Sequence, residues 1–283
     1  MALAVAILAM AVSAYAIWTG SFDNASNDFN TDTLDPPTSL AASVFGSSIK
    51  LDWTATVDTY ADNYKVLRST SAGGSYSQID TVTPVTTATY TDSTAAAGTR
   101  YYYVLQTSEA TNWLSLNSNE ANSAVPVVVT NPATCNSSNS WTSPANAQGA
   151  PDNIYATAAP AKNGTVNGDW ACFGFDSAIP AGSVITKVEI LAEYKVSTAT
   201  SIATLRVNTL VGGAVQGGTI EDTSEPLSDF DYVSDHTSLR SWTRTDLLDA
   251  NFSVRGGAHR ANSNTAVTLS LDSVRVRVTY TPP

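Results

Sequence analysis

Short runs of alternating apolar and polar residues recur along most of this chain, with turn residues between them. Ile49–Trp53, Tyr64–Arg68 and Tyr101–Leu105 are examples in the first half, and longer runs follow in the second half. A two-residue period places successive side chains on opposite faces of a strand. Many such strands at close spacing are typical of β-sandwiches. The chain is therefore predicted to be all-β, with two β-sandwich domains.

The composition supports two cores and argues against one class of partner. The chain has 283 residues, of which 43% are hydrophobic, and this is enough for two domains of ordinary size. It carries 25 acidic residues against 14 Lys and Arg, a net charge of −11. A nucleic-acid-binding protein needs a basic face, so no nucleic-acid partner is predicted. No cofactor is expected, and Ca²⁺ is the one ion that the excess acid favours.

The first 18 residues form an uncharged apolar segment. It is short for a membrane span, which needs about 20 apolar residues, and is typical of a signal-peptide core. Ala14-Tyr15-Ala16 would serve as a cleavage site, so that the mature chain begins near Ile17. Alternatively the segment is retained as a helix, as in a pilin whose leader was removed upstream, although Val5 stands where a bacterial pilin carries Glu. In both cases contact with the membrane is transient, before export or assembly.

The stretch from Ala14 to Pro37 resembles the amino terminus of camelysin/TasA-type exported proteins. The matching positions are aromatic residues and a Thr-Leu-Asp motif, namely Trp18, Phe22, Phe29, Thr33, Leu34 and Asp35, with Asp32 in place of the usual Gly. The resemblance implies secretion. For the fibre formers of that family it implies assembly in which one subunit's terminal strand completes the next subunit's sheet. Residues 1–37 are therefore interpreted as an export and assembly segment, whose candidate assembly residues are Leu3, Ile7, Leu8, Trp18, Phe22, Phe29 and Leu34.

Residues 38–126 resemble a fibronectin type III domain. The resemblance rests on the opening Pro-Pro-Thr-x-Leu, on Trp53, on Lys65–Arg68 and on the Gly-Thr-x-Tyr-Tyr-Tyr-Val run near Tyr103. It implies a sandwich in which Trp53 and an inward-facing tyrosine belong to the core, in a domain that serves as spacer or interaction module. Residues 127–132 are predicted to be a linker.

Residues 133–283 resemble a carbohydrate-binding-module-like jelly roll of bacterial surface proteins. The matching motifs are Phe173-Gly174-Phe175, Ile179–Ile185 and Leu271–Tyr280, and they are structural, so they imply a fold and no ligand residues. The expected strands are Val184–Tyr194, Thr204–Leu210, Ala266–Leu271 and Val274–Tyr280. The two cysteines, Cys135 and Cys172, both lie in this domain, and in an exported protein a disulfide is the simplest outcome; two buried free thiols are the alternative.

The stretch Ile220–Phe252 is irregular and rich in acids. Asp229, Asp231 and Asp235 lie close together in sequence, with Trp242 nearby. One interpretation is a loop that binds Ca²⁺ or a glycan. The simpler interpretation is a set of solvated turn acids, with Trp242 closing the core.

Neither histidine belongs to a recognisable catalytic motif. His236 and His259 are expected to be exposed loop residues, and no zinc-protease, nucleophile-elbow or phosphate-loop motif occurs. The protein is therefore predicted not to be an enzyme. The predicted function is that of a structural subunit of an extracellular, pilus- or fibre-like filament at the cell surface, a homopolymer. The alternative is a secreted adhesin or matrix protein that binds surface polysaccharide.

Overall fold

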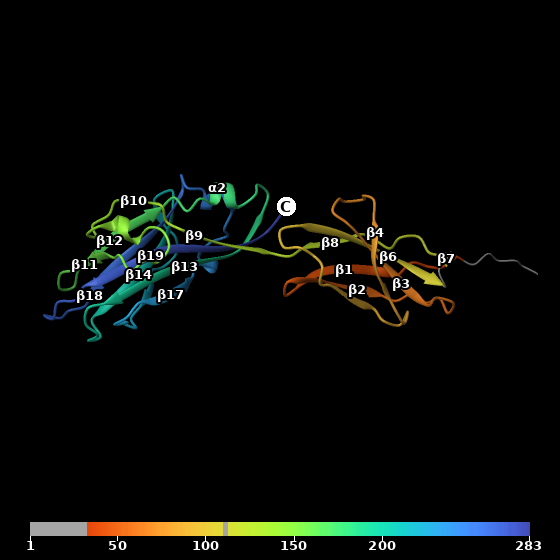
Figure 1. Cartoon of the computed structure of the whole chain (residues 1–283), viewed down its shortest axis with the longest axis horizontal. Coiled ribbons are helices and arrows are strands. Elements are labelled where there is room, and N and C mark those ends of the chain that lie inside the picture. The colour runs from red at the N-terminus through yellow and green to blue at the C-terminus, as the bar shows by residue number, and fades with distance from the viewer. Residues whose placement is uncertain (1–32, 110–112) are drawn as a thin grey trace, which may run out of the picture.

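The computed structural model describes residues 33–109 and 113–283, which form two β-sandwiches arranged end to end (Figure 1). The all-β prediction with two sandwich domains is confirmed. None of the helices in this described part has the length and apolar character needed to cross a membrane. The candidate assembly residues that lie outside the described ranges are Leu3, Ile7, Leu8, Trp18, Phe22 and Phe29.

The first domain has a fibronectin type III-like strand order. Its strands are β1 (Thr38–Phe45), β2 (Ser48–Thr54), β3 (Asn63–Ser69), β4 (Ser77–Val82), β5 (Thr89–Asp92), β6 (Arg100–Glu109), β7 (Trp113–Leu114) and β8 (Ala121–Ala124). One sheet has the order β1-β2-β5, and the other has β4-β3-β6-β8, with β7 pairing the end of β6. Two antiparallel sheets with the strands divided between them in this way are typical of immunoglobulin-like sandwiches.

The core of this domain is built by the alternation seen in the sequence. Trp53 and Tyr64 pack edge to face with ring centroids 5.4 Å apart, and both are buried. Tyr103 is also buried, and its hydroxyl donates to Asp92 Oδ2 at 2.8 Å. Arg68 pairs with the same carboxylate at 2.7 Å, so that this buried charge is compensated. The predicted core roles of Trp53 and of an inward-facing tyrosine are confirmed.

The second domain is a jelly roll. Its strands are β9 (Val127–Pro132), β10 (Cys135–Ser137), β11 (Ala156–Ala158), β12 (Thr165–Ala171), β13 (Val184–Val196), β14 (Ala203–Val211), β15 (Ala214–Val215), β16 (Ile220–Asp222), β17 (Phe230–Asp235), β18 (Phe252–Arg260) and β19 (Leu269–Thr281). Helical turns are η1 (Pro144–Ala147), α2 (Phe175–Ala178), η2 (Thr237–Leu239) and η3 (Arg244–Leu247). The sheets β11-β19-β13-β17 and β12-β18-β14-β16 have the strand order of a jelly roll.

Two details of the second domain differ from the prediction. Residues 127–132, predicted as a linker, are strand β9, which pairs with β19 from Tyr280 to Arg275. Val127 and Val129 pack against the core, and the backbone of β9 bonds to β19 instead of to water. The runs Ala266–Leu271 and Val274–Tyr280 were predicted as two strands, but the end of the first run, from Leu269, and the whole second run belong to the single strand β19, and residues 266–268 precede it. The register shifts opposite β13 where the two runs meet, and this irregularity interrupts the alternation.

The two cysteines form the predicted disulfide. Cys135 and Cys172 are bonded, with their Cα atoms 5.5 Å apart, and the bond ties β10 to the loop after β12. Closing a loop of this length stabilises the fold by roughly 3–4 kcal/mol in the chain-entropy estimate. A structural disulfide indicates an oxidising compartment.

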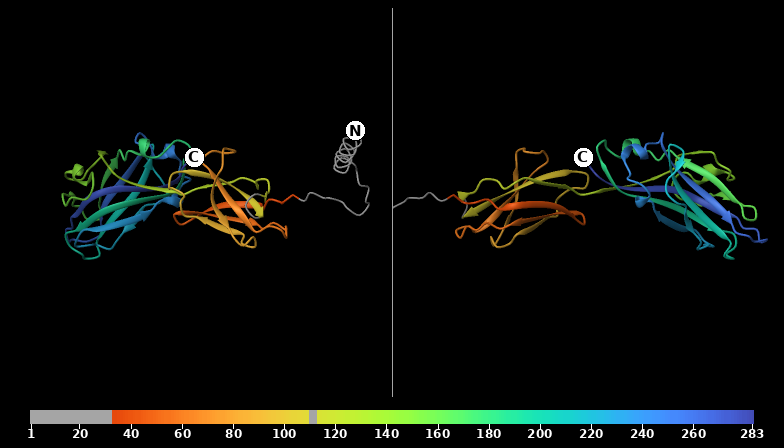
Figure 2. Two further views of the ribbon diagram at one scale, coloured as in Figure 1. Left: turned by 45° about the vertical axis from the view of Figure 1, so that its right-hand side comes forward. Right: turned by 180° about the vertical axis from the view of Figure 1, so that it is seen from behind.

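Only Val125 and Pro126 separate the last strand of the first domain from β9. The two domains also touch directly, because Arg100 Nη2 donates to the carbonyl of Pro282 at 2.9 Å. Strand β6 runs from Arg100, beside this junction, to Glu109 at the opposite end of the first domain. The carboxyl terminus lies beside the junction in both views of Figure 2.

Candidate functional site

Residues 33–37 join the first domain at its end remote from the second domain, which we call the tip. The Leu34 side chain is 5% exposed, so this one described member of the predicted assembly set is part of the domain core. Asp35 is held through its backbone, because its N–H donates to Asp58 and its carbonyl accepts from Thr107 Oγ1 at 2.7 Å. Residues 34 and 35 are thus fixed to one end of the first domain.

Exposed apolar side chains gather around this attachment point. We call them the tip patch; its members are Val57, Tyr60, Trp113, Leu114 and Leu116, and Val57 and Leu116 are 85% and 83% exposed. They come from two connections that meet here: Asp62 N donates to the carbonyl of Ser108, which pairs with Leu114 of β7. Gathered apolar side chains on a surface mark interaction sites.

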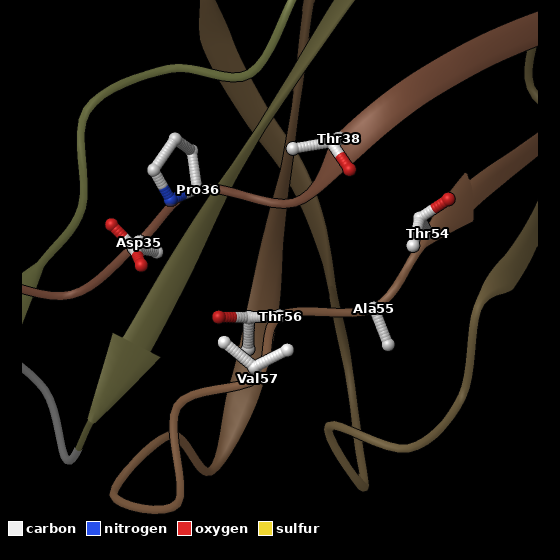
Figure 3. A pocket seen from close by; sticks show the side chains of 7 residues that line it. All are labelled: Asp35, Pro36, Thr38, Thr54, Ala55, Thr56 and Val57. Atoms are coloured by element: carbon white, nitrogen blue, oxygen red, sulfur yellow. The ribbon is translucent and has the colours of Figure 1, made fainter.

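A cavity of about 260 Å³ lies beside the tip patch (Figure 3). It is lined by residues at and before the start of β1 and at and after the end of β2, namely Asp35, Pro36, Thr38, Thr54, Ala55, Thr56 and Val57. Most of the lining is apolar, and the groups drawn in Figure 3 include one carboxylate and three threonine hydroxyls. Such a lining suits packing of another chain segment better than acid–base chemistry, which needs a base positioned beside a reacting group.

The acids of the predicted ligand loop are each engaged by the protein. Asp229 pairs with Lys195 at 3.3 Å and accepts from the hydroxyl of Tyr155 at 2.9 Å. Asp231 pairs with Arg275. Asp235 Oδ1 accepts from Thr237 N at 2.8 Å, and the hydrogen bonds from Thr237 lower the pKa of this carboxyl. Within residues 33–109 and 113–283, no group of three or more His, Cys, Asp or Glu side chains is placed to hold a metal ion.

Trp242 closes the core of the second domain. It is only 8% exposed, it packs edge to face on Phe252 with centroids 6.0 Å apart, and its Nε1 donates to the carbonyl of His236 at 2.9 Å. The simpler interpretation of this residue is therefore correct. Calcium or glycan binding at Asp229, Asp231 and Asp235 stays a prediction.

The expectation that both histidines are exposed loop residues is wrong. His236 is 0% exposed; its Nε2 lies 3.0 Å from Ser234 Oγ and its Nδ1 3.4 Å from Thr209 Oγ1, and burial lowers its pKa to about 4. His259 is half-buried in β18, with Nδ1 3.0 Å from Thr165 Oγ1. A signal was present in the sequence: continuing the alternation of β17 by one step past Ser234 places His236 on the inner face.

No protein-family model matches the chain, and a comparison with curated proteins found no match. Among solved structures, it is similar to an Fn3-like protein from Clostridium thermocellum, with 38% identity over 32% of this chain and 92% of that chain and a TM-score of 0.28. It is also similar to pectate lyase Pel3 from Pectobacterium carotovorum, with 29% identity over 32% of this chain and 27% of that chain and a TM-score of 0.27. A β-1,2-glucanase from Parabacteroides distasonis is 21% identical over 34% of this chain and 13% of that chain, with a TM-score of 0.29. The chain thus covers about a quarter or less of the two enzymes.

Proposed function

We propose that this protein is an exported structural subunit of an extracellular filament, which assembles with copies of itself through its N-terminal segment. The observation that supports the proposal most is where that segment is attached. Residues 33–37 join the tip, and the second domain lies at the other end of the first domain (Figure 1). An assembly segment placed there would leave the second domain free to project from the filament.

The two modes of assembly make the same demand on the tip. If residues 1–18 stay as a helix, the helices of many subunits pack into a core. If the chain is cleaved near Ile17, the following residues add a strand to a neighbour's sheet. Residues 35 and 36, through which the assembly segment joins the first domain, line the same cavity as Val57 of the tip patch. Covering Val57, Trp113 and Leu116 would remove apolar area from water, at about 25 cal/mol per Å².

The remaining features suit a role outside the cell at its surface. Two compact cores, the Cys135–Cys172 disulfide and a net charge of −11 favour persistence and solubility in an oxidising environment. The role is structural and not enzymatic in this proposal.

The first experiment is electron microscopy of material sheared from cells that secrete the full chain, with the amino-terminal residue determined on the same material. Filaments whose subunit begins at Met1 would support a helical core, and a start near Ile17 would support strand donation. A secreted chain that stays monomeric, with no filaments on the cells, would contradict the proposal. The secreted adhesin would then be the better interpretation.

A pair of variants tests whether the tip contributes. Leu116→Asp places a charge in the tip patch, and we expect it to reduce filament yield at least tenfold without loss of secreted protein. Leu227→Asp is the matched control, because Leu227 is also an exposed leucine, 65% accessible, but lies in the second domain. Equal filament yield from the two variants would show that the tip patch is not part of the assembly contact.

A further inference from the structure

Strand β17 (Phe230–Asp235) forms one edge of the sheet β11-β19-β13-β17 (Figure 1). It pairs with β13 on one side, and within residues 33–109 and 113–283 no strand pairs with it on the other. About half of the backbone N–H and C=O groups of an edge strand point away from its sheet, where they can bond to a further strand. The unpaired edge of β17 is therefore a place where another chain can be added to this sheet.

The outer face of β17 presents acidic and apolar side chains in turn. Asp231, Val233 and Asp235 lie on this face, because successive side chains of a strand point to opposite sides. Ser234 lies on the other face and is buried in the sandwich. Val233 is 43% exposed, and Phe230 at the start of the strand is 45% exposed. The outer face thus reads acid, apolar, acid, at a spacing of two residues along the strand.

The charged side chains of β17 itself are both acidic, and the cations near them stand on β13 and β19, one and two strands further in. Arg275 on β19 pairs with Asp231 but also lies 3.6 Å from Glu193, so one guanidinium serves two carboxylates. Lys187 on β13 pairs with Glu189 at 2.7 Å. A strand added at this edge would therefore meet negative charge first.

Two of the neighbouring carboxyl groups reflect this arrangement in their pKa values. The hydrogen bonds from Thr237 lower the pKa of Asp235, so this carboxylate stays ionised at neutral pH. Burial raises the pKa of Glu193, and the nearby Asp231 raises it further. Crowded like charges have this effect on a carboxyl group. An incoming cation would relieve the repulsion among these acids.

The same acids oppose pairing of this edge with a second copy of itself. In an antiparallel pair, residues directly opposite each other lie on the same face. Placing Val233 opposite its counterpart sets Asp231 of each chain against Asp235 of the other. Like charges directly opposite destabilise such a pair, and charged edges protect natural sheets from self-association in this way. An arrangement that disfavours a second copy favours a strand of opposite charge.

We propose that the edge of β17 binds an extended, basic segment of another protein, which adds a strand to this sheet. The segment carries Lys or Arg at two positions four residues apart, with an apolar residue midway between them. In an antiparallel register its cations face Asp231 and Asp235, and its apolar residue packs on Val233. The main chain supplies affinity, and the alternate side chains supply specificity. Binding here is independent of filament assembly, because β17 lies in the second domain and the tip patch in the first.

The test is ¹⁵N NMR of the full chain, secreted with its disulfide intact, titrated with a disulfide-closed β-hairpin peptide. One strand of the peptide reads Lys-Thr-Val-Thr-Lys, and closure into a hairpin lowers the entropy cost of binding. A matched hairpin reads Glu-Thr-Val-Thr-Glu. We expect the Lys hairpin to shift the amide signals of residues 230–235 with a dissociation constant of about 1 mM or below in about 50 mM salt. The Glu hairpin should bind at least tenfold more weakly.

Three results would overturn the proposal. The first is the absence of a shift at about 10 mM Lys hairpin, or shifts confined to residues outside β17 and β13. The second is equal affinity for the two hairpins. The third is slower amide exchange of residues 230–235 as the concentration of the chain itself rises, because a second copy would then occupy the edge.

Two double variants connect binding to the acids of the edge. Asp231→Asn with Asp235→Asn removes both charges and keeps an oxygen acceptor for the existing hydrogen bonds. We expect it to bind the Lys hairpin at least tenfold more weakly than the wild type does. Asp80→Asn with Glu120→Gln is the matched control, because it removes two charges from exposed acids of the first domain, and it should bind like the wild type. Equal affinity of the two double variants, with the wild-type spectrum otherwise preserved, would refute the assignment.

Discussion

The buried histidine of the second domain makes the stability of that domain depend on pH in a defined window. His236 has no exposed surface and contacts the hydroxyls of Ser234 and Thr209, which stabilise a neutral ring but supply no negative charge. Burial lowers its pKa from 6.5 to about 4, and the nearby Asp235 opposes this only in part. The folded state therefore holds the imidazole neutral under conditions in which the unfolded chain protonates it.

The sign and size of the effect follow from linkage. Above pH 6.5 the ring is neutral in both states, and the full stability is present. As the pH falls from 6.5 towards 4, the unfolded state binds the proton first, so the free energy of unfolding decreases. The total loss is about 3 kcal/mol, at roughly 1.4 kcal/mol per pH unit, and about 1.4 kcal/mol of it is reached by pH 5.5. Carboxylates whose pKa is lowered in the folded state also reduce the free energy of unfolding as the pH falls. They do so only at more acid pH, because their pKa in the unfolded state is close to 4.

The assay is urea unfolding of the oxidised protein at pH 7.5 and pH 5.5, followed by tryptophan fluorescence. The wild type should lose about 1–2 kcal/mol of unfolding free energy between the two pH values. His236→Gln should lose most of this dependence. His259→Gln is the matched control, because burial lowers the pKa of His259 as well but only part of this side chain is buried.

The first domain provides an internal reference, because the two histidines of the chain both lie in the second domain. Unfolding of the first domain should be flat between pH 7.5 and 5.5. A wild-type second domain that is equally stable at both pH values, or a His236→Gln variant that keeps the full dependence, would refute the reasoning.

Two further predictions concern stability, and a third concerns the pKa of a buried carboxyl group. Replacing Cys135 and Cys172 by Ser should lower the unfolding free energy of the second domain by roughly 3–4 kcal/mol in urea titrations, and a loss below about 1 kcal/mol would contradict the loop-closure argument. Trp53→Ala should destabilise the first domain by about 3–5 kcal/mol and leave the second domain's transition in place, as measured by calorimetry. Arg277→Gln should raise the pKa of Glu189, because the hydrogen bond from Arg277 is the main cause that holds it low; an unchanged carboxyl titration in NMR would show that Lys187 suffices.

The sequence predicts those parts of the fold in which one strand face is buried. Ile49–Trp53 and Val184–Tyr194 alternate because their inner side chains build the two cores, so the pattern and the structure have one cause. Residues 127–132 alternate too little to be recognised. Their strand exists because β19, far along the chain, offers an unpaired edge. Local patterns carry no information about a partner that is distant in sequence.

The surfaces proposed for function were harder to predict, for a related reason. Val57 and Leu116 belong to connections, which follow no period, and they come together only because their two loops meet at one end of the first domain. His236 is the exception. Once β17 is recognised as a strand with Ser234 on its inner face, the two-residue alternation places His236 on the same face.

The position of the tip patch leads to one more prediction about assembled filaments. Strand β6 alone, from Arg100 to Glu109, separates the tip from the junction by about 30 Å, and the second domain lies beyond the junction (Figure 1). A neighbour that covers the tip therefore has no need to cover the second domain. The amide hydrogens of the second domain should therefore exchange with solvent at the same rates in sheared filaments as in the unassembled chain, as measured by hydrogen–deuterium exchange. Slower exchange across the second domain in filaments would show that this domain is buried in the polymer, and would exclude a filament built through the tip alone.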